Sequence, residues 1–319
     1  MASVKKLKIG TRGSELALVQ TRQVVAALQS AHPQVEIEIV TLSTLGDRKQ
    51  GTARASDSDK KDWVIDLELA LLDRSIDLAV HSGKDVPNDI EAGTELLAVL
   101  KRADPRDAFL GKRIDSSGKR LAFADLPQGA RVGTASLRRK AELLRLRPDL
   151  EIIDCRGNVP TRVRKLDDTS DFVGIVLAVA GLQRLGLSDL GYEALDSRSI
   201  LPAINQGTLC VQMYAGDAER RELLDPLVDR NTYVAWRAER GCCEVLQGDC
   251  NSAIGIFADV EAEQVRLRAR VMSPDGVECI DVERLGDAND AFKLGQELGQ
   301  QLLDLGAGEI IALGCRVLG

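Results

Sequence analysis

The chain has 319 residues, of which 44% are hydrophobic and 29% charged, so it is long enough for two or three globular domains. It has no apolar run that could cross a bilayer, and its start, MASVKKLKIGTRGSE, lacks the apolar region of a signal peptide. We therefore expect a cytoplasmic protein without a membrane partner, and the net charge of −7 argues against nucleic acid as a partner.

Strand and helix patterns alternate from the beginning of the chain. The expected strands lie at 6–10, 36–44, 76–80 and 95–102, with helices at 14–30 and 63–72. Ser14 is placed to cap the first helix. The polar stretch 46–61 (GDRKQGTARASDSDKK) has no apolar period and predicts a mobile surface loop.

A second alternating unit starts near Pro105. Its expected strands lie at 107–112, 130–134, 151–155 and 172–178, and its helices at 136–147 and 158–166. The segment 199–213 (SILPAINQGTLCVQM) then looks like a return to a sheet. Repeated strand–helix units predict open, mostly parallel sheets that bind ligands at the carboxyl ends of their strands.

The last third of the chain has the pattern of a small α+β domain. We expect a helix at 231–246, strands at 253–262, 265–273 and 277–285, a helix at 288–305 and a short terminal strand. SPDG, at 273–276, predicts a turn between the last two long strands.

Positive charge gathers in one segment of this acidic chain. Residues 131–165 hold ten Arg or Lys against four Asp or Glu, a local charge of +6, which leaves −13 for the remainder. A protein that repels polyanions as a whole but concentrates cations locally is suited to a small acidic ligand in a basic cleft.

Arginines also stand at the starts of three expected helices, where they oppose the helix dipole at a cost of about 0.3–1 kcal/mol each. They are Arg12 before Ser14, Arg138 and Arg139 after Ser136, and Arg156 and Arg162 around Asn158. Helix N–H groups and guanidinium forks that converge in this way bind carboxylates or phosphates. Because no GK[ST] ending is present, carboxylates are the better candidates.

The stretch HSGKDVP, at 81–87, places a charged pair at the end of an expected buried strand, and Pro87 stiffens the turn. Lys84 could hold an anionic ligand group, and Asp85 could hold or protonate a cationic one. A surface ion pair is the alternative interpretation.

Seven cysteines without an export signal predict reduced thiols. The spacing of Cys242, Cys243 and Cys250 is not that of zinc ligands, so we expect no metal. Spacing alone does not select among these three thiols.

Several stretches of the sequence, taken together, form a pattern that is specific for one protein family. They are IGTRGSELALVQ (9–20), LAVHSGKDVP (78–87), DPRDAF (104–109), VGTASLRRKAELLRLRPDL (132–150), RGNVPTRVRKLD (156–167), LAVAGLQRLGL (177–187), LPAINQGTL (201–209) and GDCNSAIG (248–255). In the order of these stretches and in the distances between them, the sequence resembles the porphobilinogen deaminase (hydroxymethylbilane synthase) family over nearly the whole chain.

The resemblance implies a transferase of tetrapyrrole and haem biosynthesis. Such an enzyme condenses four porphobilinogen molecules into the linear tetrapyrrole hydroxymethylbilane and releases ammonia at each addition. The product grows on a dipyrromethane cofactor that is held by a thioether to one cysteine. Each added ring brings two carboxylates, which suits a basic cleft.

The resemblance also assigns residues. Asp85 matches the catalytic aspartate, which stabilises a positive azafulvene-like intermediate, and Cys250 matches the cofactor-bearing cysteine. Residues that match the binders of cofactor or substrate carboxylates are Arg12, Ser14, Lys84, Arg138, Arg139, Arg156, Arg162 and Arg184. Supporting hydrogen-bond donors are matched by Ser82, Thr134 and Ser136.

The fold implied has three domains, and because nothing in the sequence suggests an obligate assembly, we expect a monomer. Domain 1 comprises 1–104 and 201–222, domain 2 comprises 105–200, and domain 3 comprises 226–319 and carries the cysteine. The first two are α/β domains that resemble type II periplasmic binding proteins. The chain departs from the family pattern at Asp249 and Asn205, where glycine is common, and in the loop 46–61.

Two other classes of protein remain as alternatives. One is a non-catalytic, two-domain binding protein for a small polycarboxylate, against which the missing export signal and the third domain argue. The other is a nucleic-acid-binding module built on 131–165, against which the net charge and the 3% aromatic content argue.

Overall fold

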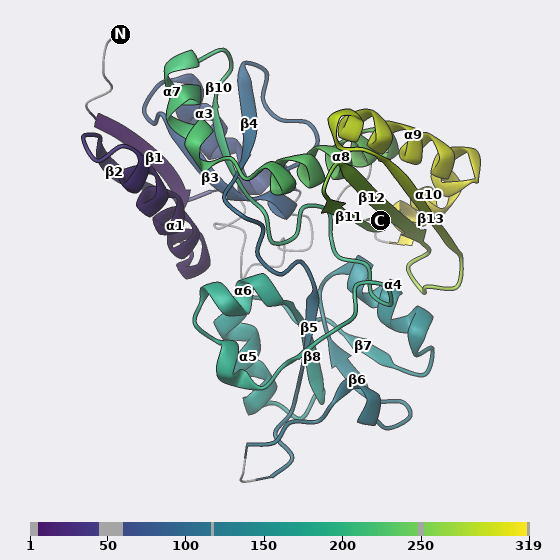
Figure 1. Ribbon diagram of the computed structural model, residues 1–319. Coiled ribbons are helices and arrows are strands. Elements are labelled where there is room, and N and C mark those ends of the chain that lie inside the picture. The colour runs from purple at the N-terminus through teal and green to yellow at the C-terminus, as the bar shows by residue number, and fades with distance from the viewer. Residues whose placement is uncertain (1–5, 45–59, 116–117, 248–251, 318–319) are drawn as a thin grey trace. The chain divides into compact units, whose positions relative to one another are not determined.

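The computed structural model describes residues 6–44, 60–115, 118–247 and 252–317. Two five-stranded sheets with helices and one three-stranded sheet with helices account for these residues (Figure 1). The predicted fold class, two α/β domains and a small α+β domain at the C-terminal end, is confirmed. By internal contacts the chain forms two compact units, Met1–Ala103 with Thr208–Trp236 and Asp104–Gly207 with Arg237–Gly319.

The first unit contains a mixed sheet with the strand order β2-β1-β3-β10-β4. Its strands are β1 (Lys6–Arg12), β2 (Glu36–Leu42), β3 (Leu78–Ser82), β4 (Thr94–Val99) and β10 (Leu209–Tyr214). Its helices are α1 (Glu15–Ala31), α3 (Ile65–Leu72) and α7 (Ala218–Leu224), with 3-10 turns at Lys60–Trp63, Gly83–Asp85 and Asp225–Leu227. Helix α8 (Arg230–Leu246) begins in this unit.

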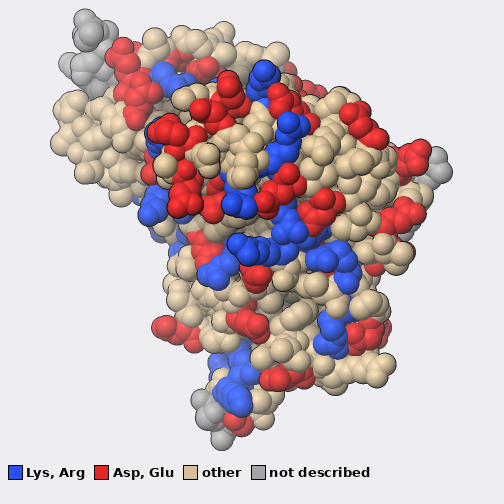
Figure 2. Space-filling model, turned by 45° about the vertical axis from the view of Figure 1, so that its right-hand side comes forward, with Lys and Arg blue, Asp and Glu red and all other residues tan. Residues whose placement is uncertain are grey.

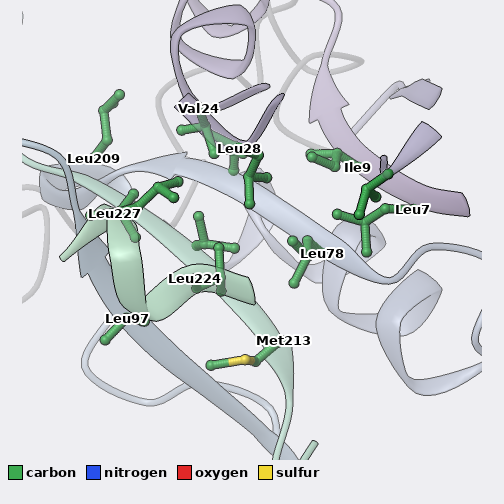
Figure 3. Packing of buried hydrophobic residues seen from close by; sticks show 14 residues of the cluster. Leu7, Ile9, Val24, Leu28, Leu78, Leu97, Leu209, Met213, Leu224 and Leu227 are labelled. Atoms are coloured by element: carbon green, nitrogen blue, oxygen red, sulfur yellow. The ribbon is translucent and has the colours of Figure 1, made fainter. Parts of the chain in front are cut away.

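The core between α1 and the sheet follows from two periodicities. Leu7 and Ile9 alternate along β1 and face inward, as the two-residue period of a strand requires. Val24 and Leu28, four residues apart, form the buried face of α1. These side chains meet Met213 of β10 and others in one apolar cluster (Figure 3).

The second unit repeats the sheet plan with the order β7-β6-β8-β5-β9. Its strands are β5 (Asp107–Gly111), β6 (Arg131–Gly133), β7 (Glu151–Ile153), β8 (Gly174–Ala178) and β9 (Glu193–Ala194). Helices α4 (Leu137–Leu146), α5 (Val159–Asp168) and α6 (Val179–Arg184) connect them, with 3-10 turns at Phe123–Asp125 and Ser188–Leu190. Apolar clusters cover both faces of the sheet.

In each five-stranded sheet four strands run in one direction and one, β10 or β5, runs against them, so the expectation of mostly parallel sheets is confirmed. In the first unit β1 pairs in parallel with β2 and β3, whereas β10 pairs antiparallel with β3 and β4. In the second unit β6 is parallel to β7 and β8, and β5 is antiparallel to β8 and β9. Strands β10 and β5 are not the next strands of a repeating strand–helix unit, and the local pattern does not fix their direction.

The C-terminal sheet has the antiparallel order β11-β12-β13. Its strands are β11 (Ala253–Glu261), β12 (Gln264–Met272) and β13 (Cys279–Asp287), followed by a 3-10 turn at Ala288–Asp290 and by helices α9 (Ala291–Asp304) and α10 (Ala307–Val317). The short terminal strand is therefore wrong. Positions 307, 310 and 314 are buried, and their spacing of three and four residues is that of a helix.

The predicted domain boundaries stay a prediction. The expected return of 201–222 to the first sheet agrees with the place of β10 between β3 and β4. In the described residues no helix is long and apolar enough to cross a membrane.

Glycines allow α8 and α9 to approach closely. A Cβ atom added to Gly295 of α9 would lie 2.1 Å from the carbonyl oxygen of Ala238, and one added to Gly241 of α8 would lie 2.2 Å from that of Phe292. Because both obstacles are backbone atoms, a side chain there forces the helices apart.

We predict that Gly295→Ala lowers the free energy of unfolding by about 1–3 kcal/mol, the cost of an overpacked core. Gly308→Ala is the matched control, since its added Cβ would approach only Leu303, at 3.8 Å. The control should stay within about 1 kcal/mol of the wild type. Urea unfolding followed by circular dichroism measures both, and equal midpoints for the two variants would contradict the packing argument.

Candidate functional site

Two neighbouring strands of the first unit end beside each other. Arg12 is the last residue of β1, and Ser82 is the last residue of β3. Because β1 and β3 are parallel, with Gly10 opposite Ala79, their carboxyl ends lie at one edge of the sheet. The 3-10 turn Gly83–Asp85 continues from β3 and leaves Asp85 half-buried. The structure thus gathers the sequence-predicted residues of the first unit at this edge.

Two serine hydroxyl groups accept hydrogen bonds at this edge. The Oγ atom of Ser14 accepts a hydrogen bond from the N–H of Ala17 at 3.3 Å, which confirms Ser14 as the N-cap of α1. The Oγ atom of Ser82 accepts one from Nε2 of Gln20 at 2.6 Å. Sequence reasoning missed Gln20, although it is the last residue of the stretch IGTRGSELALVQ.

In the second unit, Thr134 and Ser136 shape the turn from β6 to α4. The Oγ1 atom of Thr134 accepts from the N–H of Ser136 at 3.2 Å. The Oγ atom of Ser136 accepts from the N–H of Arg139 at 3.4 Å and caps α4. Both hydroxyls therefore hold the start of the helix that carries Arg138 and Arg139.

Arg138 and Arg139 are buried and share one carboxylate. They are 5% and 6% exposed, and each places a guanidinium nitrogen 2.8 Å from an oxygen of Asp107, which is fully buried on β5. Gln206 also donates to Asp107, at 2.9 Å. Sequence reasoning missed the role of Asp107, whose only signal was its place in the stretch DPRDAF.

The charges around Asp107 outweigh its burial. Burial alone would raise the pKa of this carboxyl, but the neighbouring guanidinium groups of Arg138 and Arg139 hold it well below its usual range. The carboxylate stays ionised, so the two arginines and Asp107 together carry one net positive charge.

Arg162 and Arg184 have carbonyl partners but form no ion pair within the described residues. Nε of Arg162 donates to the carbonyl oxygen of Gly157 at 2.6 Å, and Arg184 donates to that of Gly207 at 2.7 Å. Burial lowers the pKa of Arg184 to about 10. Burial, followed by the positive charge of Arg139, lowers the pKa of Arg162. Such desolvated cations fit a ligand that brings its own carboxylates.

Arg156 lies nearer to solvent than the other arginines. Its Nε atom is 2.7 Å from a carboxylate oxygen of Asp154, and both side chains are about half exposed. The N-cap of α5 is confirmed, because Asn158 accepts from the N–H of Thr161 at 2.9 Å.

Asn205, at a position where glycine was expected, has a φ of 54°. Asparagine is one of the few other residues that tolerate this left-handed region. The left-handed backbone at this position is therefore compatible with asparagine as well as with glycine.

Cys250, Asp249 and most of the loop 46–61 lie outside the described residues. The two other cysteines of the group, Cys242 and Cys243, are buried in α8. Burial raises the pKa of Cys242 well above its usual range, which disfavours the reactive thiolate.

The fold and the site define a mixed α/β protein with buried arginines suited to a polycarboxylate. Family models described as "Porphobilinogen deaminase, dipyromethane cofactor binding domain" and "Porphobilinogen deaminase, C-terminal domain" match residues 7–222 and 233–304. The chain belongs to the porphobilinogen deaminase family.

Curated relatives match this chain over nearly its full length. The chain is 43% identical to the porphobilinogen deaminase of Syntrophobacter fumaroxidans, over 96% of both chains. It is 39% identical to that of Syntrophomonas wolfei, over 97% of this chain and 98% of the relative. Among solved structures, the periplasmic VFT2 domain of Bordetella pertussis BvgS matches 70% of this chain and 87% of its own, with 14% identity and a TM-score of 0.42.

We predict that Asp107→Asn lowers the free energy of unfolding by about 3–5 kcal/mol, because it leaves two buried guanidinium groups without a counter-charge. Asp154→Asn is the matched control, since it removes an exposed ion pair whose loss should cost less than about 1 kcal/mol. Urea unfolding near neutral pH measures both differences.

The effect of Asp107→Asn should depend on pH. The lowered pKa means that the carboxylate stabilises the fold above its unfolded pKa of about 3.9 and loses this contribution as the pH falls further. The difference from the wild type should therefore persist down to about pH 4 and shrink below it. A difference no larger than that of Asp154→Asn would contradict the buried ion pair.

Proposed function

We propose that the chain is a transferase, a porphobilinogen deaminase (hydroxymethylbilane synthase). It condenses four porphobilinogen molecules stepwise on a covalent dipyrromethane primer and releases hydroxymethylbilane and ammonia. One observation carries this proposal: 43% identity over 96% of the chain to an enzyme of that name. The family model for the dipyrromethane-binding domain supports the cofactor.

Asp85 is the proposed catalytic carboxylate. Loss of ammonia from the aminomethyl group breaks its C–N bond and leaves the methylene carbon and its pyrrole positively charged, and a fixed carboxylate stabilises that charge. The same group can orient pyrrole N–H groups by accepting their hydrogen bonds. The half-buried place of Asp85, on a turn closed by Pro87, supports a preorganised role.

The cations are the proposed carboxylate binders. Arg162 and Arg184 are the strongest candidates, because they lie partly buried without an ion pair in the described part of the chain. Arg138 and Arg139 add one net charge beyond Asp107. The remaining proposed binders of cofactor or substrate are Arg12, Ser14, Lys84 and Arg156, with support from Ser82, Thr134 and Ser136.

Cys250 is the proposed attachment point, through a thioether. When bound, the dipyrromethane supplies the pyrrole ring to which the first substrate molecule is joined. The burial of Cys242 and Cys243 disfavours these two thiols and supports the choice of Cys250.

We further propose a cytoplasmic monomer that binds no nucleic acid. The net charge is −7, and acidic side chains stand among the basic ones on the face drawn in Figure 2. A surface of that kind does not favour a polyanion. The alternative of a non-catalytic binding protein is not favoured, because both family models belong to the deaminase.

We predict that the intact mass of the purified chain exceeds the calculated 34.5 kDa by one dipyrromethane. Cys250→Ser should remove the excess and the colour that Ehrlich's reagent gives with pyrroles. Cys279→Ser is the matched control, because this cysteine is exposed and is not the proposed attachment point, and it should keep both signals. An unmodified wild-type chain, or an excess that persists in Cys250→Ser, contradicts the proposed attachment.

We predict that Asp85→Asn keeps the circular dichroism spectrum of the wild type and lowers the rate of hydroxymethylbilane formation by at least about 10²-fold. The substitution keeps the shape of the side chain and removes its charge. Asp89→Asn changes an exposed carboxylate in the following loop and should leave the rate near that of the wild type. Near-normal turnover of Asp85→Asn would refute the assigned role.

A further inference from the structure

A polar cluster lies between α3 and the sheet of the first unit, on a face that is otherwise apolar. In the antiparallel register of β3 and β10, His81 stands opposite Cys210, and Gln212 stands opposite Ala79. Since alternate residues share a face, His81 and Gln212 point to the same side as Ala79. Ala79 packs against Leu67 and Leu71 of α3, so this helix covers the face.

Hydrogen bonds fix the orientation of Gln212. Its Nε2 atom donates to Oε1 of Glu68 at 2.9 Å and to Oγ1 of Thr94 at 2.8 Å, which uses both amide hydrogens. A flipped amide would place its oxygen against the carboxylate of Glu68, which is fully buried. The Oε1 atom of Gln212 therefore remains an acceptor.

The amide oxygen of Gln212 and the ring of His81 can serve each other as hydrogen-bond acceptor and donor. Oε1 of Gln212 and Nε2 of His81 are both buried, and neither has a hydrogen-bond partner among the described residues. These two atoms are the natural partners of each other, with the ring proton on Nε2.

The surroundings keep the His81 ring neutral. Burial is the largest influence and lowers the pKa of His81 to about 4, against the opposing effects of Gln212 and of the negative charge of Asp85. Arg12, at the end of β1, lowers it further. On β10, the thiol of Cys210 donates to the carbonyl oxygen of His81, and Glu68 of α3 reaches the ring only through Gln212.

We propose that His81 is a positioning residue for Asp85: burial keeps the ring neutral, and Gln212, oriented by Glu68 and Thr94, accepts a hydrogen bond from Nε2, so that no imidazolium offsets the charge of Asp85. This inference rests on the proposed catalytic role of Asp85. A cationic His81 ring beside Asp85 would compete for this carboxylate with the positive charge that develops on the substrate.

Exchanging the carboxylate and the amide tests this proposal. The double variant Glu68→Gln with Gln212→Glu keeps the composition and the net charge of the cluster but places a carboxylate against His81. A neighbouring opposite charge raises a histidine pKa by about 1–3 units, so the ring becomes cationic as the pH falls. Relative to the wild type, turnover should fall by about tenfold or more as the pH falls from about 7 to about 5, and it should recover above that range.

Glu68→Gln alone is the matched control, because it keeps a neutral amide at position 212. Its pH profile should keep the shape of the wild-type profile. A double variant with the wild-type profile overturns the proposal, provided that the wild type is active. An inactive wild type would instead reject the proposed function, so the two failures are distinguishable.

A second measurement does not depend on activity or on the folding of the double variant. The chain has only two histidines, so His32→Gln leaves a single imidazole signal in a spectrum of ring-labelled protein. We expect the ring nitrogen shifts of His81 to be those of the neutral tautomer with the proton on Nε2, down to about pH 5. An imidazolium at neutral pH, or a proton on Nδ1, overturns the proposal.

Discussion

The buried carboxylate of Asp107 is the constraint on which the cationic region of the second unit depends. Two guanidinium groups, those of Arg138 and Arg139, lie 2.8 Å from its oxygens in a part of the sheet that excludes water. Without this counter-charge, two cations would be buried side by side at the start of α4, at a cost of several kcal/mol. With it, the helix start is fixed against β5, and one positive charge is left for a ligand.

Two further arginines of the second unit extend this arrangement without an ion pair to any described residue. Arg162 and Arg184 are held by carbonyl oxygens, and burial makes their charged forms less stable than in water. A fold that served stability alone would pair such groups or expose them. A ligand that adds two carboxylates with each new ring would compensate the buried charges of these two arginines. The cost of burying them is therefore explained by the proposed reaction.

The sequence predicted most elements, because periodicity and capping are local properties. Ser14, Ser136 and Asn158 cap their helices as their positions indicated. The reversed direction of β10 was not predictable from local pattern, because β10 joins strands more than a hundred residues away. The C-terminal helix α10 was missed because its apolar run is short. The roles of Asp107 and Gln212 depend on partners that only the tertiary fold brings together.

These arginines are placed to bind the carboxylates of a growing pyrrole chain, and this is the central claim. A crystal structure of the protein with its pyrrole oligomer bound tests this claim most directly. The account predicts oligomer carboxylate oxygens at charge-assisted hydrogen-bond distance, about 2.7–2.9 Å, from the guanidinium groups of Arg162 and Arg184. It would be contradicted if both arginines kept only the carbonyl oxygens of Gly157 and Gly207 while the oligomer bound elsewhere.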